Sequence, residues 1–65
     1  MYGRLIINTP TGSAQISTKY PSSIYEYLIE HGCDHDTAAN VVGWAQVASV
    51  MEEYELDGFE LYITE

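Results

Sequence analysis

The sequence is poor in positive charge. Its 65 residues include 2 Lys and Arg residues against 10 Asp and Glu residues, which gives a formal net charge of −8 at pH 7. A protein that binds the phosphate backbone of a nucleic acid through charge needs Lys and Arg in excess. We therefore expect no direct binding to nucleic acid.

Cysteine and long apolar runs are scarce as well. The only cysteine, Cys33, has no partner for an intramolecular disulfide, which favours a reducing compartment. No segment approaches the roughly 18 apolar residues of a membrane span, and no apolar region of a secretory signal follows Met1. We therefore expect a cytoplasmic protein that makes no membrane contact.

Motifs for catalysis, cofactors and metals are missing. No glycine-rich phosphate loop is present, so the sequence predicts no cofactor. His31, Cys33 and His35 are zinc-competent, but structural zinc sites take paired ligands from two separated elements, and no second pair exists. The acids of residues 53–58 fail the calcium-loop pattern because Thr64 stands where a bidentate Glu is required. We therefore expect a protein that is not an enzyme and holds no metal.

The sequence does contain enough apolar side chains for a core. Hydrophobic residues make up 46% of the chain and include six tyrosines, which is too apolar for a disordered acidic tail. The length allows a single domain, residues 1–65. Residues 1–20 hold both cations and no acid, whereas residues 21–65 hold all ten acids. Because no linker separates these parts, we expect one domain with differently charged faces.

Alternating hydrophobicity predicts three strands. Residues 2–8 place Leu5 and Ile7 on one face, and a turn at residues 9–12 leads to a second strand over residues 13–18. The third strand spans residues 58–64, and we prefer to place it beside the first.

Two helices are predicted between the second and third strands. A capping box formed by Ser23 and Glu26 predicts a helix over residues 24–31, which Gly32 ends in a left-handed conformation. A second helix follows Asp34 or Asp36 and is predicted to reach Met51 or Glu53. The order ββααβ favours an α+β fold, a small two-layer domain in which two helices cover one face of a three-stranded antiparallel sheet.

The strongest functional feature is a run of acids near the C-terminus. Five carboxylates lie within nine residues, from Glu52 to Glu60, and no Lys or Arg lies among them. Such a surface can imitate a nucleic-acid backbone and dock on a basic groove, with the neighbouring Tyr54 as an exposed apolar anchor. The candidate partner-binding residues are Glu52, Glu53, Tyr54, Glu55 and Asp57, with Glu26 and Glu30 of the first helix next.

As a class, small acidic chains with few cysteines and no enzyme motif resemble inhibitors from phages and mobile elements, including anti-CRISPR proteins and DNA mimics. The resemblance covers composition and no spacing of residues. It implies a stoichiometric inhibitor that occupies the basic nucleic-acid-binding surface of a target protein.

Three other interpretations remain open. The acids can serve solubility alone. The second helix is apolar nearly all round, so the protein can instead form a homodimer through this helix or through the sheet face that carries Tyr2, Ile6 and Tyr62. The third interpretation is a metal-dependent switch at His31, Cys33 and His35. The candidate dimer face on the second helix consists of Ala39, Gly43, Val47 and Val50.

Overall fold

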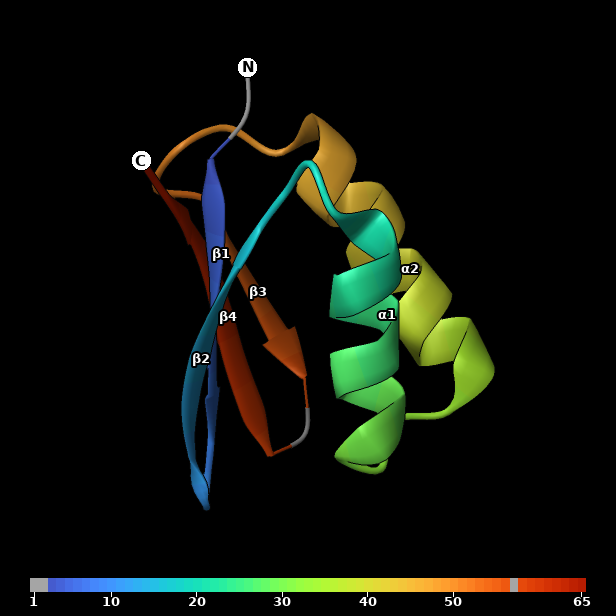
Figure 1. Cartoon of the computed structure of the whole chain (residues 1–65). Coiled ribbons are helices and arrows are strands. Elements are labelled where there is room, and N and C mark those ends of the chain that lie inside the picture. The colour runs from blue at the N-terminus through green and yellow to red at the C-terminus, as the bar shows by residue number, and fades with distance from the viewer. Residues whose placement is uncertain (1–2, 57) are drawn as a thin grey trace.

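The computed structural model describes residues 3–56 and 58–65. The elements are β1 (Arg4–Thr9), β2 (Gly12–Ser17), α1 (Pro21–Glu30), α2 (His35–Val47), β3 (Glu53–Leu56) and β4 (Phe59–Thr64). The four strands form one antiparallel sheet in the order β2-β1-β4-β3. Both helices lie against the same face of this sheet (Figure 1). The predicted α+β class is confirmed, but the predicted count of three strands is wrong.

The additional strand, β3, lies in the acidic segment between α2 and β4. Leu56 pairs with Phe59, so only two residues of the sequence join β3 to β4. Gly58 has a φ of 86°, which glycine adopts without strain and which suits a tight hairpin turn. The strand over residues 59–64 pairs with β1, as we expected.

The core lies between the helices and the inner face of the sheet. Leu5 and Ile7 are completely buried on β1, which confirms the predicted alternation. Ile24 and Leu28 of α1 are equally buried and pack against them. The remaining core residues are Ala38, Val41 and Ala45 of α2, with Leu61 and Ile63 of β4.

Helix α1 begins earlier than the capping box predicts. Pro21 occupies the start of the helix and Tyr20 is the N-cap, without a side-chain capping bond. Proline suits this position because its fixed φ is helical and its missing amide would have no partner there. The predicted Ser23 cap is therefore wrong. The predicted end is confirmed, since Gly32 has a φ of 96° and its amide bonds to the Ile29 carbonyl.

Helix α2 ends at Val47, several residues before the predicted end. Ala48 is already extended, with φ −71° and ψ 146°. The chain then turns back to the sheet, where the Met51 amide donates to the carbonyl of Ile63 at 2.9 Å. Met51 has a φ of 79°, which is uncommon for a residue with a side chain. The apolar pattern of residues 48–51 therefore belongs to a return loop and not to the helix.

Thr18 ties β1, β2 and α2 together at one end of the domain. Its side chain is 4% exposed, and its hydroxyl accepts a hydrogen bond from the Gly3 amide at 3.0 Å. The Gln46 side chain donates to the Thr18 carbonyl at 2.8 Å. A Cβ on Gly3 would lie 2.7 Å from the Thr64 carbonyl oxygen, so only glycine fits there. These contacts fix the end of α2 to the sheet.

Candidate functional site

No described residue covers the face of the sheet opposite the helices, and we call this face the open face. Tyr2, which was expected on this face, lies outside the described residues. The side chains of the open face are those that alternate with the core residues of each strand. The open face consists of Arg4, Ile6 and Asn8 of β1, Ser13, Gln15 and Ser17 of β2, Glu53 and Glu55 of β3, and Glu60, Tyr62 and Thr64 of β4.

Three acids of the open face gather on β3 and β4, and we call them the acidic edge: Glu53, Glu55 and Glu60. Glu55 stands directly opposite Glu60 in the antiparallel pair, and Glu53 stands opposite Tyr62. All three acids are exposed. Like charges directly opposite each other destabilise a sheet. The fold therefore carries this arrangement at a cost in stability.

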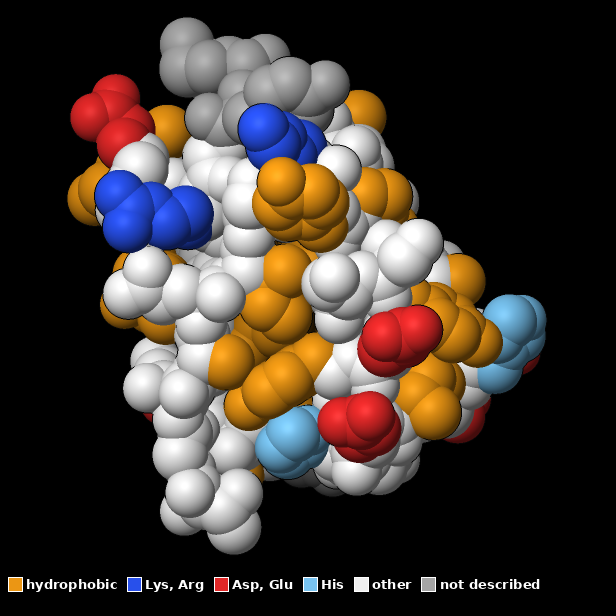
Figure 2. All heavy atoms as spheres, viewed as in Figure 1, with side chains coloured by type: hydrophobic (Ala, Val, Ile, Leu, Met, Phe, Trp, Pro, Cys, Tyr) orange, Lys and Arg blue, Asp and Glu red, His pale blue; other side chains and the backbone are white. Residues whose placement is uncertain are grey.

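Neither cation of the chain neutralises the acidic edge. The Arg4 guanidinium donates to the Gln15 side chain at 3.3 Å, toward β2 and away from β3. The Lys19 ammonium lies 5.6 Å from the centre of the Tyr20 ring. In Figure 2 the Lys and Arg side chains lie toward one end of the molecule, where one acidic side chain also lies, and other acidic side chains stand over the helices. The acidic edge thus presents negative charge to solvent.

Tyr54 does not lie on the exposed surface that the sequence predicts for it. The side chain is half-buried on the helix side of the sheet, and its ring centre lies 5.2 Å from that of Trp44. Because Glu53 and Glu55 face outward, the residue between them must face the core. The expectation of an exposed Tyr54 anchor is therefore wrong. Tyr62 takes that place, since it is 38% exposed beside Glu53.

The other predicted acids are divided between two surfaces. Glu52 is exposed in the loop that precedes β3 and is the neighbour of Glu53 in the sequence. Glu26 and Glu30 are exposed on α1, in the other layer of the fold. Glu26 and Glu30 therefore do not form one patch with the acidic edge. Asp57 lies outside the described residues.

The predicted dimer face is only partly present. Ala39, Gly43 and Val47 are exposed on α2, and Val47 is 82% exposed. A Cβ on Gly43 would meet nothing within 4 Å, so α1 does not cover this position. Val50 lies beyond the end of α2 and packs against the core. The expectation that all four residues share one helix face is therefore wrong for Val50.

The histidines around Cys33 bind to tyrosines of α1. His31 stacks on Tyr27 with ring centres 4.0 Å apart, and the His35 ring hydrogen-bonds to the hydroxyl of Tyr25. Among the described residues, no three His, Cys, Asp or Glu side chains gather so that they could hold a metal ion.

Burial, and secondarily the charge of Asp34, raises the pKa of the Cys33 thiol. A raised pKa disfavours the thiolate that a nucleophile requires.

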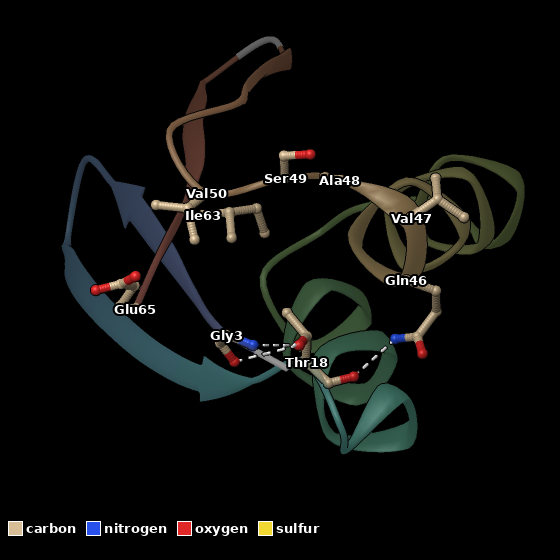
Figure 3. A pocket seen from close by; sticks show the side chains of 9 residues that line it. All are labelled: Gly3, Thr18, Gln46, Val47, Ala48, Ser49, Val50, Ile63 and Glu65. Carbon is tan, nitrogen blue, oxygen red and sulfur yellow. Dashed lines mark hydrogen bonds between the residues drawn. The ribbon is translucent and has the colours of Figure 1, made fainter. Parts of the chain in front are cut away.

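A cavity of about 440 Å³ opens at the end of the molecule where α2 meets the sheet (Figure 3). Three of its lining residues already bond to one another, because Thr18 pairs with Gly3 and Gln46 donates to Thr18. Glu65 is the titratable side chain among its lining residues. The described residues that line the cavity therefore do not include the paired acid and base that general acid–base catalysis needs.

A comparison of the chain with protein-family models, curated proteins and solved structures found no match. No helix in the part of the chain that the structure describes is long and apolar enough to cross a membrane. The functional inference therefore rests on the surfaces described above.

Proposed function

We propose that this protein is a non-enzymatic cytoplasmic inhibitor whose acidic edge docks on a basic, nucleic-acid-binding surface of a target protein. The observation that supports the proposal is the exposed row of Glu53, Glu55 and Glu60, which neither Arg4 nor Lys19 neutralises. The target class is a nucleic-acid-binding enzyme or effector, as for the phage and mobile-element inhibitors that the composition resembles.

The mechanism is competition for the basic surface. Opposite charges steer two proteins together and raise the association rate, more than they raise affinity. The acidic edge supplies this attraction, and Tyr62 beside it supplies an aromatic side chain that loses water on contact. A target that is occupied in this way cannot bind nucleic acid on the same surface.

The cost of the acidic edge also favours a function for it. Glu55 opposite Glu60 lowers stability, and acids placed for solubility alone can be spread over the surface or mixed with lysines at no such cost. A docking surface, by contrast, requires the charges to lie together.

The test compares two variants with equal net charge. In E53Q/E55Q two charges are removed from the acidic edge, and in E26Q/E30Q two are removed from α1. The wild type and both variants are immobilised, a bacterial lysate is passed over each, and bound proteins are eluted with rising salt. We expect a nucleic-acid-binding protein that elutes at moderate salt from the wild type and from E26Q/E30Q but is lost from E53Q/E55Q, because screening weakens exposed charge pairs.

The captured protein is then mixed with a fluorescent DNA or RNA duplex and titrated with the wild-type protein. Release of the duplex at stoichiometric amounts supports the proposal. Equal retention by E53Q/E55Q and the wild type, or binding that does not displace the duplex, contradicts it.

A further inference from the structure

The two edges of the sheet are built differently. The edge strand β3 has four residues, and its outward side chains are Glu53 and Glu55, so charge and short length discourage pairing with another strand. The opposite edge strand, β2, has six residues, GSAQIS, with no charge and no proline. Its register with β1 is unbroken from Ser17 to Gly12, so no bulge twists the edge away. Strand β2 therefore lacks the features that protect β3.

The backbone of β2 presents hydrogen-bonding groups to solvent. The Thr18 amide donates to the Gly3 carbonyl at 2.9 Å, which fixes the alternation along the strand. Ala14 and Ile16 therefore bond to β1, and Ser13, Gln15 and Ser17 direct their amides and carbonyls away from the sheet. The Ser17 carbonyl already accepts a bond from the Tyr20 amide at 3.0 Å. The other outward groups of these three residues are directed at the uncovered edge.

We propose that β2 pairs antiparallel with β2 of a second copy and joins the two sheets into one. The outward residues are symmetric about Gln15, so a twofold axis at Gln15 places Gln15 opposite Gln15 and Ser13 opposite Ser17. The two Gln15 residues exchange two bonds, and each Ser17 amide donates to a Ser13 carbonyl. On the helix side, the small Ala14 then lies opposite the larger Ile16 of the second copy.

The charge distribution favours this edge for contact between identical copies. Residues 1–20 contain no acid, so the pairing brings no carboxylate of β2 against another. In the joined sheet the two β3 strands lie at opposite ends, about 34 Å apart at the usual strand spacing. That separation is several times the Debye length of about 8 Å at physiological salt, so repulsion between the acidic edges is screened.

An apolar seam beside β2 adds a second reason for pairing. Tyr25 lines the groove between α1 and α2, so Tyr27, two residues on, points to the other side of α1, toward β2. Tyr27 and Ile16 are half-buried, and Figure 2 shows hydrophobic side chains exposed between the strand edge and α1. A second copy at the β2 edge removes part of this seam from water.

Replacement of Gln15 by charged residues tests the proposal, because the twofold axis places residue 15 of one copy opposite residue 15 of the other. We measure the mass of the wild type by sedimentation from micromolar to millimolar concentration and expect it to rise from 7.3 kDa to twice that value. Gln15→Lys and Gln15→Glu should each remain monomeric because of like-charge contact, and their mixture should recover the double mass. The matched controls, Asn40→Lys and Asn40→Glu on α2, should behave like the wild type.

Amide hydrogen exchange gives a second readout that needs no variant. The amides of Gln15 and Ser17 should exchange more slowly as concentration rises, while those of Glu53 and Glu55, which face outward on the other edge, should not change. A monomer at every concentration overturns the proposal. So does a dimer that ignores both Gln15 variants but dissociates with Gly43→Glu, which assigns the contact to α2. These outcomes are independent of any target protein, so they leave the proposed inhibitor function to its own test.

Discussion

Replacing Glu55 by Gln should stabilise the fold. Glu55 and Glu60 form a non-hydrogen-bonded pair, because Ile63 donates to Glu52 and the alternation directs the Glu60 backbone to β1. Their Cα atoms are then about 4.5 Å apart. With carboxylates roughly 6 Å apart in water, Coulomb's law gives a repulsion of about 0.7 kcal/mol. Glu55→Gln removes this repulsion while it keeps the length and shape of the side chain.

The dependence on salt identifies the cause. Screening leaves about 0.6 kcal/mol of the repulsion at low ionic strength, near 10 mM, and about 0.1 kcal/mol at 1 M. The melting temperature of the variant should therefore be about 2–5 °C above that of the wild type at low salt. At high salt the two melting temperatures should be nearly equal. Thermal unfolding followed by circular dichroism at both ionic strengths measures the difference.

Three further variants separate the local pair from the net charge. Glu60→Gln should give the same gain as Glu55→Gln, and the double variant should add little, since either substitution alone removes the pair. Glu52→Gln changes the net charge equally but lies in the loop before β3, and it should give a smaller gain. Equal gains from Glu52→Gln and Glu55→Gln, or a gain that persists in 1 M salt, would refute the reasoning.

Three other predictions concern positions outside the acidic edge. Gly3→Ala should destabilise the fold by roughly 1–3 kcal/mol, because the new methyl would lie 2.7 Å from the Thr64 carbonyl oxygen; chemical denaturation measures this loss. Thr18→Val should cost about 1–3 kcal/mol in the same assay, since the Gly3 amide loses its hydroxyl acceptor, and a cost below the error would contradict the proposed tie. Cys33 should react with iodoacetamide more slowly in the folded protein than in urea at pH 8, because burial and Asp34 raise the pKa of the thiol, and the difference should narrow as pH rises through that pKa.

The parts of the fold that follow from local pattern were predictable from the sequence. The alternation around Leu5 and Ile7 gives β1, and Gly32 ends α1, because each signal lies within a few residues of the structure that it specifies. Strand β3 was missed because its acids resemble a solvated linker. Yet Tyr54 and Leu56 alternate with Glu53 and Glu55, and a two-residue Asp-Gly link before Phe59 is typical of a hairpin.

The end of α2 depended on contacts that are distant in the sequence. No glycine or proline stops the apolar pattern between Val47 and Met51. The chain leaves the helix because the backbones of Met51 and Glu52 bond to Ile63. The hydrophobic periodicity of residues 47–51 contains no information about a residue so far along the chain. The same return loop brings the acids to β3, so the position of Tyr54 could be derived only after the strand was known.

The pairing of β1 with β4 sets the order in which this domain can fold. Asn8 pairs with Glu60, so the middle of the sheet forms only after about fifty intervening residues are closed into a loop. Closing a flexible loop of that length costs on the order of 3–4 kcal/mol in chain entropy. The β1–β2 hairpin and the α1–α2 pair can form locally, but the central pairing of the sheet forms only when β4 joins β1. A chain in which β4 has not yet paired therefore leaves one backbone edge of β1 open, and this edge can pair with a strand of another chain.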